Sequence, residues 1–245
     1  MQQASQVFEP TSIPEPVRVF SKVTEEVQPN AIRFELDQVD REETLRLVQR
    51  IFLQQTQNPP RTVLFAAVSP GAGCSQVCLL VAEALRANVK GTVCLVEADF
   101  RSPALPSRLG TTNHYGLSDA LLKDGPIRSF AKPVHADNLW FLSSGSVTPD
   151  TPNLLNSDRM KARFDELRKE FDYVLVDVPS LSRYSDATAV ARITDGIVLV
   201  LEANATRKEA ALKIIESLRN AQVPVLGAVL NKRTFPIPAS LYDKL

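Results

Sequence analysis

Residues 63–80 of the chain read VLFAAVSPGAGCSQVCLL, which is an apolar run, a glycine-rich turn and an amphipathic stretch. This order is typical of a strand, a phosphate-binding loop and a helix. The glycines let backbone N–H groups turn inward, and the N-terminus of the helix adds positive potential. Such loops end in Gly-Lys-Ser or Gly-Lys-Thr, but here the end is Gly73-Cys74-Ser75. The sequence therefore predicts where a nucleotide would lie, while a thiol replaces the ammonium that would neutralise its outer phosphates.

Apolar runs and helical patterns alternate along the rest of the chain. Each run consists of consecutive apolar side chains, as expected of strands that are covered on both faces. This alternation predicts an α/β fold of three layers, with a mostly parallel sheet and helices on both of its faces. Loop-borne chemistry then lies at the carboxyl ends of the strands. The predicted strands are 92–96, 139–142, 173–176, 196–201 and 225–230, and the predicted helices are 158–170, 186–193 and 206–221.

Composition divides the chain into one domain and two tails. In residues 1–38, prolines interrupt a polar sequence without an apolar period, which predicts a flexible tail; a short edge strand at 32–36 is left open. Residues 39–233 are predicted to form one domain, and residues 234–245 a short C-terminal tail. A capping-box pattern at Asp40 predicts the start of an outer helix. The 44% apolar content is enough for a full core.

Composition also argues against several classes of function. Acidic and basic residues are equal in number, 28 each, so no overall field attracts a nucleic acid, and no nucleic-acid partner is expected. No stretch approaches the ~20 consecutive apolar residues of a membrane-spanning helix, and no direct membrane insertion is expected. The polar N-terminus does not resemble a signal peptide. The cysteines, Cys74, Cys78 and Cys94, are odd in number and lie at a predicted loop, helix and buried strand, which indicates free thiols in a reducing cytoplasm. Their spacing, without a nearby histidine, fits no zinc pattern.

Carboxylates follow two of the predicted strands. Glu97 and Asp99 come after the strand at 92–96, and Asp177 directly follows the strand at 173–176. An acidic residue that ends a strand beside a phosphate-binding loop is typical of proteins that hold magnesium there and orient water. Carboxylates also cap strand ends and helix starts for structural reasons alone. The presence of both carboxylate sites together with the loop favours the magnesium site.

These segments together resemble a known family. PGAG followed by Ser75, VCLVEADFRSP, FDYVLVDVP and VLNKR are similar to the cytoplasmic domain of bacterial tyrosine autokinases of capsule and exopolysaccharide synthesis. That family belongs to the MinD/ParA-like branch of P-loop proteins. The resemblance extends over about 42–233, and it implies a MinD/ParA-like P-loop NTPase fold that uses ATP and Mg²⁺.

The resemblance also implies roles for individual residues. Asn231 would lie against the adenine base, although a turn cap explains it equally well. The family pattern implies catalytic roles for Glu97, Asp99 and Asp177, magnesium binding by Ser75, Asp99 and Asp177, and nucleotide binding by Gly71, Ala72, Gly73, Cys74, Ser75, Gln76 and Asn231.

Three departures from the family pattern bear on activity. Cys74 replaces the lysine, and Glu97 replaces an aspartate of the extra carboxylate motif, one methylene longer. Tyr242, the phosphoacceptor candidate, stands alone where the family carries a cluster of tyrosines. Arg101 and Arg183 are candidates for a substitute cation. Cys74 itself is either a reactive thiolate at a helix N-terminus or a small residue tolerated once the lysine was lost.

Three functions are compatible with these features. The favoured one is a degenerate regulatory member with weak or lost ATP use, cytoplasmic and recruited to the inner face of the membrane by a polysaccharide co-polymerase or adaptor protein. The second is an active ATP-dependent tyrosine autokinase with a substitute cation. The third and weakest is a MinD/ParA-type positioning ATPase, since no amphipathic tail or basic face is evident. A partial Glu/Arg contact motif between Glu42 and Arg50 leaves a homo-oligomer open.

Overall fold

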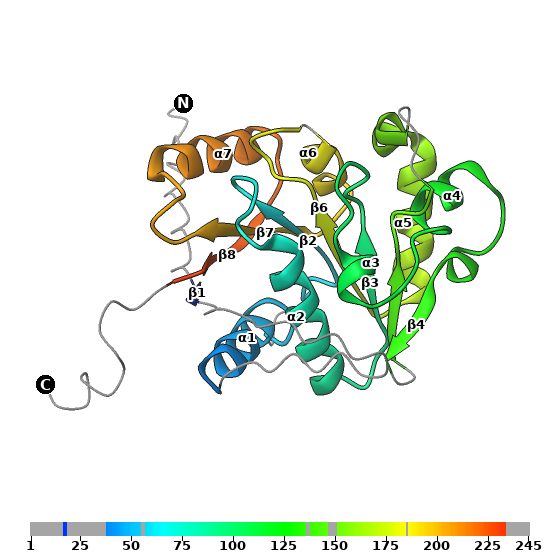
Figure 1. Ribbon diagram of the computed structural model, residues 1–245, viewed down its shortest axis with the longest axis horizontal. Coiled ribbons are helices and arrows are strands. Elements are labelled where there is room, and N and C mark those ends of the chain that lie inside the picture. The colour runs from blue at the N-terminus through cyan, green and yellow to red at the C-terminus, as the bar shows by residue number, and fades with distance from the viewer. Residues whose placement is uncertain are drawn as a thin grey trace, which may run out of the picture.

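A central sheet with helices on both faces forms the body of the protein (Figure 1). The computed structural model describes residues 17–18, 38–54, 57–135, 138–146, 151–184 and 186–233. Within them the sheet has eight strands in the order β1-β8-β7-β2-β6-β3-β5-β4, and all neighbouring strands are parallel except β4 and β5. The predicted α/β architecture with a mostly parallel sheet is confirmed.

The elements agree with the predicted alternation. The strands are β1 (Val17–Arg18), β2 (Thr62–Ala67), β3 (Val93–Glu97), β4 (Lys132–His135), β5 (Leu139–Leu142), β6 (Tyr173–Val178), β7 (Gly196–Glu202) and β8 (Val225–Asn231). The α-helices are α1 (Gln38–Ile51), α2 (Cys74–Asn88), α3 (Leu105–Arg108), α4 (Leu117–Leu122), α5 (Asp158–Glu170), α6 (Asp186–Ala191) and α7 (Lys208–Asn220). Two short 3₁₀ helices, η1 (Ile127–Phe130) and η2 (Thr151–Asn156), complete the set.

Alternating residues of the central strand β2 face two separate cores. Val63 and Phe65 pack on one side with α1 and α2, and Leu64 and Ala66 pack on the other side with α4, α5, α6 and α7. All six residues of β2 are buried, which explains its unbroken apolar sequence. Each fully buried aliphatic or aromatic side chain contributes about 1.5–3 kcal/mol through removal from water. The two cores fix β2, and with it the start of the glycine-rich loop.

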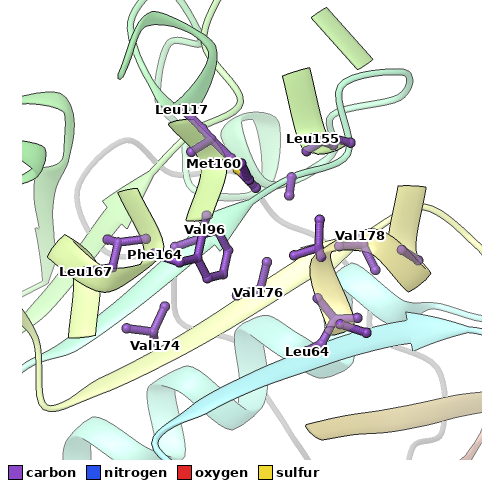
Figure 2. Close-up of a cluster of buried hydrophobic side chains, with 14 of the residues drawn as sticks. Leu64, Val96, Leu117, Leu155, Met160, Phe164, Leu167, Val174, Val176 and Val178 are labelled. Carbon is purple, nitrogen blue, oxygen red and sulfur yellow. The ribbon is translucent and has the colours of Figure 1, made fainter. Parts of the chain in front are cut away.

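The second core includes the contact between α5 and β6. Figure 2 shows Met160, Phe164 and Leu167 of α5 directed toward Val174 and Val176 of β6. The spacing of three and four residues places one face of α5 on the sheet. This packing holds β6 beside β2, so that the residue near the carboxyl end of β6 lies next to the loop that follows β2.

Several expectations about the two ends of the chain need correction or stay untested. The helix α1 begins at Gln38, so Asp40 lies in its first turn rather than at its cap, and its backbone carbonyl accepts a hydrogen bond from Thr44 (2.7 Å). Val17–Arg18 forms a parallel edge strand beside β8, where the sequence predicted no strand. The edge strand at 32–36 and most of the 1–38 tail lie outside the described residues, as does the tail at 234–245. The domain boundaries therefore remain predictions.

None of the helices in the described part of the chain has the length and apolar character that crossing a membrane requires.

Candidate functional site

The loop between β2 and α2 has the backbone of a phosphate-binding cradle. Gly71 and Gly73 both adopt φ +84°, a conformation that other residues adopt only with strain. A Cβ atom at Gly73 would stand 2.4 Å from Nδ2 of Asn231, so this position also has no room for a side chain. The helix α2 begins at Cys74, directly after the loop, and its N-terminal N–H groups add positive potential there.

Two residues at the end of β8 fasten this loop to the sheet. Asn231 is buried, and its Nδ2 donates a hydrogen bond to the carbonyl of Ala72 (2.7 Å). Nζ of Lys232 donates to the carbonyl of Gly71 (2.5 Å) and pairs with Glu202 at 3.3 Å. Oδ1 of Asn231 is buried without a hydrogen-bond partner among the described residues. The predicted contact between Asn231 and adenine stays a prediction, while its contact with the loop is direct. Lys232 was not predicted from the sequence as a site residue, although its place next to Asn231 was a usable signal.

Asp177 lies at the base of the loop, near the carboxyl end of β6. Its carboxylate accepts hydrogen bonds from the side chains of Ser75 and Cys74. Burial raises the pKa of Asp177 to about 7, and these two hydrogen bonds and the charge of Arg108 oppose that increase. Oδ1 of Asp177 is buried without a partner among the described residues. The predicted approach of Asp177 to the loop is thus observed, with one oxygen left for a ligand.

The Cys74 side chain faces the carboxylate of Asp177 within the fold. Its thiol is buried and donates a hydrogen bond to Asp177. Burial raises the pKa of the Cys74 thiol well above its ordinary value, and the negative charge of Asp177 raises it further. The thiol is therefore protonated at neutral pH, and the interpretation of Cys74 as a reactive thiolate is wrong. All three cysteines are free and buried.

Glu97 ends β3 directly opposite Asp177 in the neighbouring strand. It is fully buried, and its Oε1 accepts the backbone N–H groups of Ala104 (2.6 Å) and Leu105 (2.8 Å) at the start of α3. Burial raises the pKa of Glu97 to about 7, against the lowering effect of these hydrogen bonds. The hydrogen-bonded oxygen of Glu97 thus anchors a helix, and the catalytic role that the family resemblance implies for Glu97 remains a prediction.

Asp99 occupies a turn after β3. Its Oδ1 accepts the backbone N–H groups of Arg101 and Ser102, both at 2.9 Å. Asp99 is half-buried, and its negative charge raises the pKa values of Asp177 and Cys74, which places it in the same electrostatic environment. Its proposed roles in catalysis and magnesium binding remain predictions.

The candidate substitute cations lie at different places in the structure. The guanidinium of the exposed Arg101 stacks 4.2 Å above the ring of Tyr184, and the side chain of Arg183 is also exposed. Arg108, which sequence analysis did not single out, is half-buried at the end of α3, and its Nη1 donates to Oε1 of Gln76 in the first turn of α2. Its charge lowers the pKa of Asp177. Arg108 thus contacts the helix that follows the loop.

The residues present fit a nucleotide with magnesium. The fit rests on the Gly73 position, where any side chain would be strained, and on the buried oxygen of Asp177 that has no hydrogen-bond partner among the described residues, beside the hydroxyl of Ser75. Backbone N–H groups of 71–76 would hold the phosphates, and Ser75 with Asp177 would hold the metal, directly or through water. Position 74, however, offers a thiol hydrogen bond in place of a positive charge.

A strand, a glycine loop with two left-handed residues, a helix and a carboxylate on the neighbouring strand define a P-loop nucleotide-binding protein. Residues 60–242 match a family model described as ParA, NUBPL iron-transfer P-loop NTPase. Tyrosine-protein kinase YwqD of Bacillus subtilis is 30% identical over 171 residues, which are 70% of this chain and 72% of YwqD. The chain therefore belongs to the bacterial tyrosine-kinase family within the ParA-like P-loop NTPases.

Two further similarities give the context of this membership. The succinoglycan biosynthesis transport protein ExoP of Rhizobium meliloti is 30% identical over 175 residues, which are 70% of this chain but only 22% of ExoP. The crystal structure of the chimerical protein CapA2B2 superposes with a TM-score of 0.79 at 21% identity, and the match covers 91% of this chain and 96% of that one. The first similarity links the family to polysaccharide synthesis, and the second supports the fold.

Proposed function

We propose that this protein is a regulatory member of the capsule and exopolysaccharide tyrosine-kinase family that binds nucleotide weakly and transfers phosphate poorly or not at all. The single observation that carries the proposal is the orientation of Cys74. Its neutral thiol donates to Asp177, where relatives with the usual motif carry an ammonium for the phosphates. The remaining parts of the cradle, from Gly71 to Ser75, are in place.

The weak nucleotide binding and the poor phosphate transfer both follow from the chemistry of phosphoryl transfer. The protein contributes positioning and charge neutralisation, with little covalent help. Loss of one preorganised donor to a developing charge typically lowers the rate by about 10²–10³. Binding of the ground state is affected less, because the loop N–H groups and Ser75 act on the phosphates and the metal independently of residue 74. A protein with this site is suited to sensing nucleotide rather than to turning it over.

The regulatory role is proposed to be exerted on a membrane-associated polysaccharide co-polymerase or adaptor. The support is family membership and the similarity to ExoP, a protein named for succinoglycan biosynthesis and transport. The proposed location is the cytoplasm, at the inner face of the membrane when the partner is bound. The proposed phosphoacceptor of an active form is Tyr242, which lies outside the described residues.

The test is isothermal titration of the purified protein with ATP and ADP, each with and without Mg²⁺, beside Cys74→Lys and Cys74→Ser. Serine matches cysteine in size and adds no charge. We expect weak binding to the wild type, similar binding to Cys74→Ser and at least tenfold tighter binding to Cys74→Lys, on the scale of a charge-assisted hydrogen bond. Micromolar wild-type affinity, together with phosphate transfer to Tyr242 that disappears in Asp177→Asn, would refute the proposal.

A second function, an active autokinase with a substitute cation, is favoured by one observation. Arg108 brings a guanidinium to the first turn of α2, two residues beyond Cys74. If this charge also meets the transition state, the wild type transfers phosphate without a lysine in the loop. The phosphate-transfer assay above distinguishes this function from the regulatory one.

A further inference from the structure

The two departures from the family pattern, Cys74 and Glu97, are connected through the short helix α3. Glu97 accepts the N–H groups of Ala104 and Leu105, which are the first donors of this helix. A helix of one turn has little stability of its own, so its position depends on such anchors. α3 ends at Arg108, and its neighbour in space is α2 (Figure 1). The buried carboxylate of Glu97 is thus one anchor of the helix that carries Arg108, beside the burial of Leu105 in the first core.

The surroundings of Arg108 indicate a site for a negatively charged ligand. Nη1 of Arg108 donates to Oε1 of Gln76, and Nε2 of Gln76 is buried without a hydrogen-bond partner among the described residues. Gln76 follows Ser75 in the first helical turn, where N–H groups point toward the cradle. The guanidinium of Arg108 is a planar fork of N–H donors, a geometry that suits phosphate oxygens.

The other cations near the loop have different positions. Nζ of Lys232 donates to the Gly71 carbonyl and pairs with the Glu202 carboxylate. The guanidinium of Arg101 lies on Tyr184. Arg108 is the cation that combines partial burial with a contact to the first turn of α2.

We propose that Arg108 supplies part of the positive charge at the nucleotide phosphates that a loop lysine supplies elsewhere, and that Glu97 is the positioning residue that holds Arg108 there through α3. This inference rests on the proposed nucleotide site. It explains why the side chain at position 97 is one methylene longer than the family aspartate, since the longer side chain reaches the start of α3.

The experiment is a titration of the full chain with Mg-ADP and Mg-ATP, followed by calorimetry, for the wild type and for Arg108→Gln, Arg108→Lys and Glu97→Asp. Arg219→Gln, on the exposed surface of α7, is the control. We expect Arg108→Gln to weaken binding roughly 10- to 100-fold, as for a lost charge-assisted hydrogen bond. Arg108→Lys keeps part of the affinity, and Arg219→Gln binds as the wild type does. Thermal denaturation of each variant establishes that it is folded.

A double-mutant cycle tests the role of Glu97. Glu97→Asp withdraws the carboxylate from α3 but keeps its charge, so it should weaken binding in the wild type and have little further effect in Arg108→Gln. A merely structural role of Glu97 would weaken binding equally in both backgrounds. Cys74→Lys should rescue Arg108→Gln by a larger factor than it improves the wild type, because the two cations serve the same phosphates.

The outcomes separate this inference from the proposed function. If the wild type binds nucleotide and Arg108→Gln binds equally well, the inference is wrong and the proposed function stands. If the wild type does not bind but Cys74→Lys does, Arg108 supplies no useful charge, and the inference is again wrong. If neither binds, both are wrong. Efficient phosphate transfer by the wild type would overturn the regulatory function, while Arg108→Gln would still decide the inference.

Discussion

Replacing Glu97 with glutamine removes a charge that the fold buries completely. Oε1 of Glu97 accepts two backbone N–H groups, at 2.6 and 2.8 Å, and a glutamine oxygen can accept the same two. Oε2 is buried without a hydrogen-bond partner among the described residues. The substitution therefore keeps the anchor of α3 and removes the ionisation, which isolates the energetic effect of the buried charge.

The magnitude follows from proton linkage. Burial raises the pKa of Glu97 to about 7 from its ordinary value of 4.5. The native state holds its proton over this interval while the unfolded chain releases it, so ionisation favours unfolding. The contribution of Glu97 to the free energy of unfolding is fully present below pH 4.5 and is lost as the pH rises through about 7. The difference between the two values corresponds to about 3 kcal/mol at alkaline pH, as an upper bound.

The measurement is urea denaturation of wild type and Glu97→Gln at pH 5, 6, 7 and 8. We expect the free energy of unfolding of the variant, relative to wild type, to increase with pH by up to about 3 kcal/mol. The exposed Glu216→Gln on α7 should show no such trend. The amide adds a buried donor whose penalty of about 1–3 kcal/mol does not vary with pH, so the trend is decisive. Parallel curves for the two proteins between pH 5 and 8 would refute the buried-charge argument.

Three further predictions concern the loop. Because the pKa of Asp177 is about 7 and a metal ligand must be ionised, the affinity for Mg-ADP should rise about tenfold from pH 6 to 8 in calorimetry, and Asp177→Asn should abolish the rise. Gly73→Ala, which brings a Cβ against Asn231 at a left-handed residue, should lower thermal stability by about 1–3 kcal/mol, more than Gly71→Ala, where no atom lies within 4 Å. The buried thiols, Cys74 included, should react with a thiol reagent only after unfolding, and rapid reaction of the native protein would contradict their burial.

The sequence was sufficient for the features that depend on local pattern. Strands buried on both faces are continuous apolar runs, and the glycines between β2 and α2 identify the cradle. It was insufficient where one side-chain atom decides the role. The extra methylene of Glu97 suggests no function until Ala104 and Leu105 are seen within reach of its carboxylate. Arg108 ends a proline-containing segment that reads as a loop, so its approach to Gln76 depends on the packing of α3 on α2.

The assignment proposed above divides the work at the phosphate-binding loop into two parts. One part is the fixing of the loop, which here falls to Asn231 and Lys232 at the end of β8. The other is the charge presented to phosphates, which we assign to Arg108. Arg108 is positioned through a one-turn helix and a buried carboxylate rather than by the loop itself. A charge that is carried by α3 rather than by the loop can stabilise a bound nucleotide. It does not move with the phosphoryl group during transfer, as the charge of a flexible lysine does. Because catalysis needs interactions that strengthen in the transition state, this arrangement supports binding more than transfer.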